Sequence, residues 1–252
     1  MEDHLINRLN KKKKIISFSL WGSNPKYLIG AIRNAELAKK IYPGWICRYY
    51  IGMSTFEKAI ETVSRLERFP NVEIIKMSEN GDWEGMLWRF YPISDTDVEV
   101  VISRDTDSRL SKRERRAVNQ WLRSSKKFHI MRDHPYHNYK ILGGMWGAKK
   151  GIVNDMKSLI DKFQGGNFYQ VDQDFLAEII FPKIENDVFI HDEFGDGKKF
   201  PSRRKDFEFV GEVYDEFDNR EDHWKALINI YSKRKQFYRR VLDYCKRLSK
   251  NR

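Results

Sequence analysis

Residues 98–109 read VEVVISRDTDSR, a β-branched run followed by two carboxylates one residue apart. The run predicts a buried strand over residues 98–103, and Asp105 and Asp107 come directly after it. In open α/β sheets, ligands gather at the carboxyl ends of the strands, where the loops diverge. Two hard oxygen ligands at such a place are suited to hold Mg²⁺ or Mn²⁺ against the phosphates of a substrate. We therefore expect a metal site on Asp105 and Asp107.

The Asp-x-Asp pattern occurs three times in the chain, so its position carries more information than its presence. Residues 95–97 follow Pro92 and precede the expected strand, which predicts a polar turn. Only the middle copy, residues 105–107, directly follows a strand. Its alternative role is a solvated turn in which an Asp or Ser108 caps the next helix.

Composition is typical of a folded chain with one large α/β domain, alone or with an appendage. The 252 residues are 40% hydrophobic and 14% aromatic, and the formal net charge is +11. Residues 225–252 hold ten basic residues and one acidic residue, a local balance of +9. The rest of the chain is nearly neutral, so the expected catalytic body need not bind a polyanion.

Cysteine usage and the N-terminal composition indicate a reducing compartment. Cys47 and Cys245 are the only cysteines, which excludes a disulfide framework and a cysteine-based zinc site. Residues 1–14 are charged and lack the apolar core of a secretory signal. No apolar run approaches the length of a membrane span. We expect a cytoplasmic protein.

Strand and helix patterns alternate at the spacing of βαβ units, which predicts a Rossmann-like, mostly parallel central sheet with helices on both faces. We expect residues 1–221 to form this α/β domain, with residues 192–221 as loops. The expected strands cover residues 15–20, 45–51, 72–77, 98–103, 128–131 and 188–191.

Residues 222–252 are predicted to form a basic amphipathic C-terminal helix. Apolar side chains recur there every three to four residues, with Lys and Arg between them. Such a helix would pack its apolar stripe on the domain, which we favour. The alternative is adsorption to an anionic membrane surface, which would make the protein peripheral at a membrane.

Several residues near the Asp-x-Asp segment are candidates for binding a phosphorylated donor. Arg89 and Arg104 would pair with phosphate or orient the two carboxylates, although Arg89 could equally cover Trp88 at the surface. Gly143 and Gly144 would let the backbone approach a ligand closely. The ring of Trp146 would offer a stacking face for a sugar.

Further candidates lie later in the chain. Asp172 and Asp174, at an expected helix start, would either cap that helix or accept hydrogen bonds from sugar hydroxyls. The imidazole of His191 would complete the coordination of a metal held by two carboxylates, or be merely structural. Three basic residues would neutralise a leaving diphosphate: Lys198, Arg203 and Arg204.

Three more histidines fall between residues 129 and 137. His129, His134 and His137 have no Cys or Glu-x-x-His context, so we expect them in a pocket wall rather than in a zinc site.

The order of these motifs resembles the GT-A class of glycosyltransferases over residues of about 15–210. The motifs are Arg-Asp-Thr-Asp-Ser-Arg at 104–109, Gly-Gly-Met-Trp-Gly at 143–147, Asp-Gln-Asp at 172–174 and the late His191-Asp192. The likeness is closest to small bacterial and viral sugar transferase domains and is distant to the glycogenin-like group. The His-x-x-Gly-x-x-Lys-Pro-Trp ending of the latter is absent here.

The resemblance implies a nucleotide-binding half, Mn²⁺ or Mg²⁺ on Asp105 and Asp107, and a late metal-binding histidine at His191. We predict a metal-dependent hexosyl- or pentosyltransferase that uses a nucleoside-diphosphate sugar and a glycan, lipid-linked or protein acceptor. The metal would act as a Lewis acid for the departing phosphate oxygen. An inverting reaction also needs a base. The candidates, in order, are Asp174, Asp172 and Asp133; a retaining reaction needs none there.

Two other functions are compatible with parts of the sequence. A sugar nucleotidyltransferase also uses a divalent metal, but it usually needs a glycine-rich basic loop after the first strand. Residues 20–26 supply one glycine and one lysine. A nucleic-acid-binding protein would explain the net charge, but that charge is confined to the tail and carboxylates dominate the expected pocket. We therefore expect no nucleic-acid partner.

Overall fold

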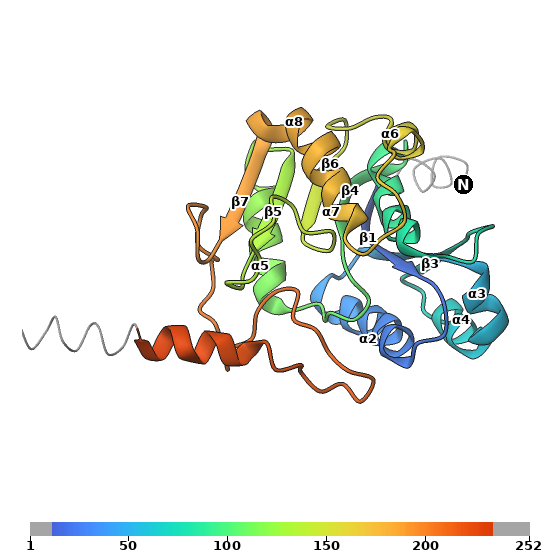
Figure 1. The fold of residues 1–252 in the computed structure, drawn as a ribbon, viewed down its shortest axis with the longest axis horizontal. Coiled ribbons are helices and arrows are strands. Elements are labelled where there is room, and N and C mark those ends of the chain that lie inside the picture. The colour runs from blue at the N-terminus through green and yellow to red at the C-terminus, as the bar shows by residue number, and fades with distance from the viewer. Residues whose placement is uncertain (1–11, 234–252) are drawn as a thin grey trace, which may run out of the picture.

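The computed structural model describes residues 12–233, which form a seven-stranded sheet covered by helices (Figure 1). The strand order is β3-β2-β1-β4-β6-β5-β7. All neighbouring strands are parallel except β6, which is antiparallel to both β4 and β5. The predicted α/β class with a mostly parallel sheet is therefore confirmed. The strands are β1 Lys13–Leu20, β2 Ile46–Ile51, β3 Val72–Lys76, β4 Val98–Ser103, β5 Phe128–Arg132, β6 Trp146–Lys149 and β7 Val188–Asp192.

Helices cover both faces of this sheet, as expected from the alternation of the pattern. On one face lie α2 (Pro25–Ile41), α4 (Ile60–Glu67) and α5 (Lys112–Leu122), with the short α3 (Met53–Lys58) before α4. On the other lie the 3-10 helix η1 (Trp83–Ser94), α6 (Met156–Lys162) and the consecutive turns α7 (Val171–Phe175), η2 (Leu176–Ile180), α8 (Phe181–Ile184) and η3 (Glu185–Asp187).

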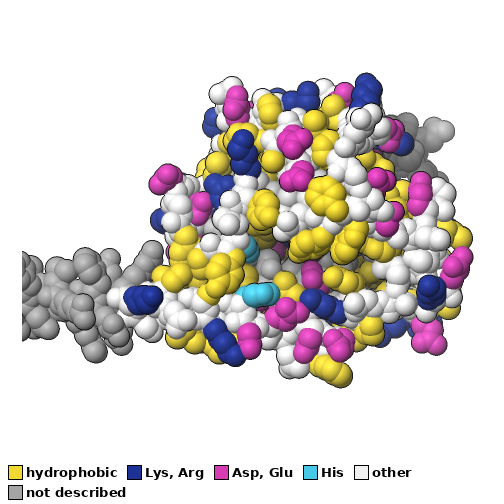
Figure 2. Space-filling view, in the orientation of Figure 1, with side chains coloured by type: hydrophobic (Ala, Val, Ile, Leu, Met, Phe, Trp, Pro, Cys, Tyr) yellow, Lys and Arg dark blue, Asp and Glu magenta, His cyan; other side chains and the backbone are white. Residues whose placement is uncertain are grey.

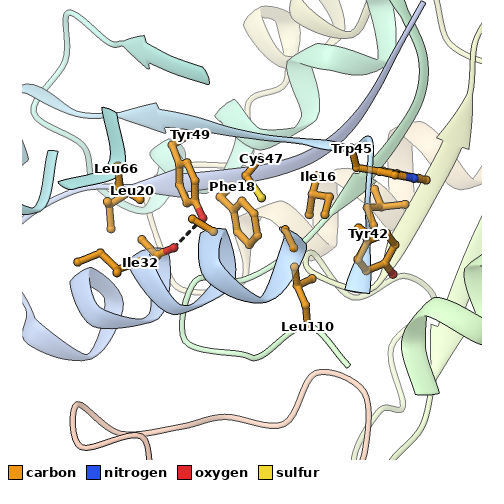
Figure 3. Close-up of a cluster of buried hydrophobic side chains, with 14 of the residues drawn as sticks. Ile16, Phe18, Leu20, Ile32, Tyr42, Trp45, Cys47, Tyr49, Leu66 and Leu110 are labelled. Carbon is orange, nitrogen blue, oxygen red and sulfur yellow. Dashed lines mark hydrogen bonds between the residues drawn. The ribbon is translucent and has the colours of Figure 1, made fainter. Parts of the chain in front are cut away.

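Alternation along each strand divides the core into two large clusters. Ile16 of β1 belongs to the cluster under α2, whereas Ile15 belongs to the cluster under η1. Figure 3 shows the first cluster, in which the ring of Phe18 stacks on that of Tyr49 at 4.8 Å. The Tyr49 hydroxyl donates to the Ala31 carbonyl at 2.7 Å, so this buried phenol is satisfied.

Local signals in the sequence explain where two of the helices begin. Asn24 accepts a hydrogen bond from the Lys26 amide at 3.0 Å, and Pro25 opens the first turn of α2. Ser111 caps α5 by accepting from the Glu114 amide at 3.1 Å. Neither Ser108 nor an Asp of the 105–107 segment has this capping role, contrary to the alternative considered for that segment.

The direction of β6 brings a third segment to the carboxyl ends of β1 and β4. Ser103, the last residue of β4, is opposite Ser17 of β1 and Trp146, the first residue of β6. The Ser103 hydroxyl also donates to the Gly143 carbonyl at 2.7 Å. Residues 143–145, just before β6, therefore lie beside the loop that follows β4.

The segment after β7 returns across this same edge of the sheet. Residues 193–223 form loops with isolated β-bridges, one of them between Ser108 and Val213.

Residues 224–233 are helical, and Leu227 is fully buried, which agrees with packing of this part on the domain. The remainder of the predicted C-terminal helix lies outside the described residues. Among the helices within residues 12–233, none combines the length and apolarity that crossing a bilayer requires.

Candidate active site

A cavity of about 620 Å³ opens at the carboxyl ends of β1 and β4. Its volume falls in the range of pockets that bind small ligands and cofactors. Its walls come from five parts of the chain: residues 19–24, 105–107, 142–145, 169–173 and 209–213, with further side chains between them. The space-filling view shows a hollow near the centre of this face, with histidine side chains beside it (Figure 2).

Arg89 connects two carboxylates at the floor of the cavity. One guanidinium nitrogen donates to Asp172 Oδ2 at 2.7 Å, and another pairs with Asp105 Oδ1. Arg89 and Asp172 are buried, but 42% of the Asp105 side chain is exposed. Burial raises the pKa of Asp172, while Arg89 opposes that shift. The sequence left open whether Arg89 pairs with a phosphate or orients a carboxylate. The contacts in the structure are with carboxylates, which agrees with the second role.

Asp107 lies on the other side of the same loop and has a different cation beside it. Its Oδ2 is 3.5 Å from Lys26 Nζ, which also forms a 2.7 Å ion pair with Glu221. Burial and then the charge of Asp105 raise the pKa of Asp107 to about 6. The charge of Asp105 therefore disfavours the charged form of Asp107, an effect that a divalent cation between the two carboxylates would relieve. We call Arg89, Asp105, Asp107 and Asp172 the cavity cluster.

Two glycines make room for this cluster. A Cβ on Gly144 would lie 2.0 Å from Asp105 Oδ2, and one on Gly143 would lie 1.8 Å from Asp172 Oδ2. Any larger residue would therefore displace a carboxylate. The sequence predicted that these glycines admit a ligand; in the structure they admit the carboxylates.

Asn34 fixes the loop that holds Asp105 and Asp107, and the sequence reading had missed it. Its buried amide donates to the carbonyls of Ser108 at 2.8 Å and Thr106 at 3.2 Å and accepts from the Leu110 amide at 3.0 Å. Gly30, one turn earlier, lets the helix approach so closely that a Cβ would lie 1.9 Å from the Thr106 carbonyl. An asparagine on the apolar face of a predicted helix was the available signal.

Two residues expected at the donor site are structural instead. Arg104 is buried and does not line the cavity, because its guanidinium donates to Glu114 at 2.9 Å and to the Trp146 carbonyl at 3.0 Å. The Trp146 ring is fully buried between Phe90 and Phe128, at 5.2 and 5.3 Å between centroids. It offers no face to a sugar, and this corrects the expectation.

Asp133, the third candidate base, is also committed to the interior. It is fully buried, and its two oxygens accept from Arg113, from Arg204 and from the Val210 amide at 2.7 to 2.9 Å. Arg204 is thereby removed from the expected role beside a leaving diphosphate. We call Arg113, Asp133 and Arg204 the buried cluster.

His191 is not available as the expected third metal ligand beside Asp105 and Asp107. Both of its ring nitrogens form hydrogen bonds inside the fold. Nε2 donates to Gln120 Oε1 at 2.9 Å, so Nδ1 accepts from His129 Nε2 at 2.8 Å. No lone pair is left for a metal, and burial lowers the pKa of His191 to about 4. The sequence predicted that His129, His134 and His137 all lie in a pocket wall. His134 and His137 do line the cavity, but His129 is buried beside His191.

Three other candidates lie outside the cavity wall. Lys198 places its ammonium 5.7 Å from the centroid of Phe189, on the side of β7, and Arg203 is exposed. Asp174, the first candidate base, is half-buried on α7 and does not line the cavity, unlike Asp172 two residues before it. Alternate positions on a helical turn point in different directions, so only one of the two Asp residues faces the site.

The donor set fits a metal that is shared with a substrate. Within residues 12–233, no group of three or more His, Cys, Asp or Glu side chains is arranged to hold an ion by itself. Asp105 and Asp107 would supply two carboxylates, and phosphate oxygens and water would complete the shell, which is the usual way that Mg²⁺ is bound. The chemistry of the residues therefore agrees with a metal that binds together with a diphosphate.

No protein-family model matches the chain, and no curated protein matches it by sequence. By structure it is similar to a glycosyltransferase involved in the glycosylation of the major capsid of PBCV-1 (TM-score 0.49, 15% identity, 72% of this chain and 82% of that one). It is also similar to the 4-diphosphocytidyl-2C-methyl-D-erythritol synthase of Anaerococcus prevotii (0.48, 12%, 74% and 89%). A third is a mannosyltransferase from Pyrobaculum calidifontis in complex with GDP-Man and Mn²⁺ (0.47, 12%, 73% and 55%), of which this chain spans little more than half.

Proposed function

We propose that this chain is a metal-dependent glycosyltransferase that moves a sugar from a nucleoside-diphosphate sugar to a hydroxyl acceptor. The observation that carries the proposal is the placement of Asp105 and Asp107 directly after β4 in the wall of a 620 Å³ cavity. The carboxyl edge of an open α/β sheet is where such folds bind nucleotides. At that edge, paired carboxylates are the expected ligands of a divalent ion that also binds phosphate.

A metal bound by Asp105 and Asp107 would supply Lewis acidity at the departing phosphate oxygen. The chain's own contribution is orientation and charge balance. Arg89 holds Asp105 in place, and Lys26 stands 3.5 Å from Asp107. These two cations balance the charge of the carboxylates, which differs from the contact with a leaving diphosphate that we expected of Lys198, Arg203 and Arg204.

Asp172 is our candidate for the base of an inverting reaction, because it alone of the three predicted carboxylates lines the cavity. Its Oδ2 is held by Arg89 at 2.7 Å, and burial raises its pKa, which favours proton uptake over that of an exposed carboxylate. The substitution Asp172→Asn should stop transfer while leaving donor binding in place if Asp172 is the base. Retention of configuration in the product would instead assign Asp172 a purely orienting role.

The double substitution Asp105→Asn, Asp107→Asn tests the proposal directly. We expect loss of Mn²⁺-dependent donor hydrolysis and transfer by about a thousandfold or more, because several kcal/mol of charge stabilisation depend on the metal. The chain contains a matched control in Asp95→Asn, Asp97→Asn. This other Asp-x-Asp segment lies before β4, where Asp95 pairs with Arg48 and Asp97 pairs with Lys13. Unchanged turnover in the first variant would refute the assignment.

A thermal-shift panel of UDP-, GDP-, TDP- and CMP-sugars with and without Mn²⁺ identifies the donor, because a ligand that binds only the folded state raises its apparent stability. The same panel addresses the rival activity. If the protein makes a nucleotide-sugar from a nucleoside triphosphate and a sugar 1-phosphate, it is a nucleotidyltransferase and our proposal is wrong.

A further inference from the structure

Charge divides the cavity into two unlike halves. One half holds the cavity cluster, with the Lys26 ammonium behind Asp107. The other is lined by residues of 134–142, by Met145 and by residues of 209–223, and in the described chain these lining side chains include no Asp, Glu, Lys or Arg. Burial lowers the pKa of His134 and, with the help of His134, lowers that of His137 to about 3. Both imidazoles are therefore neutral at pH 7.

Aromatic rings pack against one another in this second half. The His134 ring lies 4.4 Å from Phe209 and 4.8 Å from Tyr136, measured between centroids. Tyr136 itself is 64% exposed at the mouth of the cavity. Histidine side chains are visible beside the hollow in Figure 2. Rings with an apolar face and few polar groups suit a ligand that has apolar faces and polar edges.

The backbone fixes the tautomers of the two histidines. His134 Nδ1 accepts from the Tyr136 amide at 3.2 Å, so its Nε2 carries the proton and donates to the His223 carbonyl at 3.0 Å. His137 Nδ1 accepts from the Asp133 amide at 3.1 Å, so its Nε2 also carries a proton. No residue within 12–233 accepts that proton. His137 thus presents a hydrogen-bond donor in the cavity wall and has no free basic nitrogen.

We propose that this half of the cavity binds an uncharged sugar ring of the acceptor, with His137 Nε2–H donating to one of its oxygens and Tyr136 covering one of its faces. The inference rests on the proposed glycosyltransferase function and specifies its acceptor class. A phosphorylated acceptor or a basic peptide would meet no compensating charge in this half. A neutral sugar offers hydroxyl and ring oxygens to the His137 donor and C–H faces to the rings.

Direct binding tests this without relying on turnover. Ligand-detected NMR with a panel of methyl hexosides and pentosides should show binding to the wild-type chain, and the corresponding sugar phosphates should bind more weakly. His137→Leu should weaken the bound glycoside about three- to tenfold, the equivalent of one neutral hydrogen bond, and His137→Gln should restore part of it. Tyr136→Ala should weaken it as well, whereas Tyr136→Phe keeps the ring and should not.

The outcomes separate this inference from the proposed function. Glycoside binding that depends on His137 and Tyr136 supports a subsite for an uncharged sugar even if the Asp105→Asn, Asp107→Asn test fails and the acceptor role with it. Preference for sugar phosphates, or displacement of the glycoside by nucleoside monophosphates, would overturn it even if Mn²⁺-dependent donor hydrolysis is present. Because Tyr136 is exposed, the Tyr136→Ala result stays decisive if His137→Leu does not fold. In turnover, both variants should raise the acceptor KM and leave the donor KM unchanged.

Discussion

The cavity cluster and the buried cluster contain the same residue types in opposite states of satisfaction. In the buried cluster, both oxygens of Asp133 accept from two arginines and a backbone amide, and the carboxylate is inaccessible. In the cavity cluster, Asp105 has one arginine partner, its side chain is 42% exposed, and it lines a cavity. A carboxylate whose hydrogen-bonding positions are all filled stabilises the fold. One with open positions in a cavity remains available to a ligand.

The comparison also separates the two sets of arginines. Arg113 and Arg204 both pair with the buried Asp133, and Arg113 also pairs with Glu193 at 3.1 Å, whereas Arg89 pairs with Asp105 and Asp172 in the cavity wall. Substitutions in the buried cluster should therefore act on stability, and those in the cavity cluster on ligand binding and turnover.

The largest expected effect is on stability, from Asp133→Asn. Loss of this charge removes the buried carboxylate that Arg113 and Arg204 share and leaves Arg113 with the carboxylate of Glu193 alone, which should cost about 3–5 kcal/mol of unfolding free energy. Urea unfolding measures the loss. The paired variant, Asp105→Asn, should unfold near the wild-type midpoint and lose metal-dependent activity. Equal destabilisation by the two substitutions would mean that the clusters do not differ in the way described.

Gly144→Ala should disable the cavity cluster without changing any charge. The new Cβ would meet Asp105 Oδ2 at 2.0 Å, so the carboxylate must move by about an ångström. A displacement of that size at a reacting site can cost about a hundredfold in rate. Gly85→Ala is the control, since its Cβ would approach no atom closer than 3.3 Å. Steady-state transfer rates of the two variants decide the point; equal rates would argue against a precise position for Asp105.

Asn34→Ala should have a smaller effect on both stability and binding. It leaves the buried Leu110 amide without its acceptor and leaves the Thr106 and Ser108 carbonyls with Arg109 as their remaining donor, at a cost of about 1–3 kcal/mol. Because that loop carries Asp107, the affinity for Mn²⁺ with nucleotide should fall too, measured by calorimetry. Asn71→Ala is a matched control: Asn71 also contacts α2, by donating to the Ala35 carbonyl at 3.1 Å, but it lies away from the cavity. Normal Mn²⁺ affinity in Asn34→Ala would show that the loop holds its position without Asn34.

The smallest effect concerns acid stability and His191. Its folded pKa of about 4 lies below its ordinary value near 6.5, so below pH 6.5 the unfolded chain takes up this proton before the folded one does. The contribution of His191 is therefore complete above pH 6.5 and is lost as the pH falls toward 4. Because Asp107 has a raised pKa and opposes this trend, the informative quantity is a difference between variants. His191→Asn should flatten the dependence of unfolding free energy on pH between 6 and 5 by up to ~1.4 kcal/mol per unit. An unchanged slope would contradict the buried, neutral imidazole.

The sequence alone indicated the α/β class, a mostly parallel sheet and the importance of the segment after residues 98–103. These properties are local or periodic: a β-branched run predicts a strand, and the residues that follow a strand of a parallel sheet lie at its carboxyl edge. Arg89, Asp172 and the pair Gly143 and Gly144 were also found, because they belong to motifs with recognisable chemistry.

Only the tertiary structure decided which charged residues remain available to a ligand. Asp133 is satisfied by Arg113, 20 residues away, and by Arg204, 71 residues away, and no local pattern reports such partners. The Nε2–H of His191 likewise donates to Gln120, 71 residues away in the sequence. Hydrogen bonds formed across the fold, and the burial that accompanies them, determine whether an Asp, Arg or His supports the structure or faces the cavity.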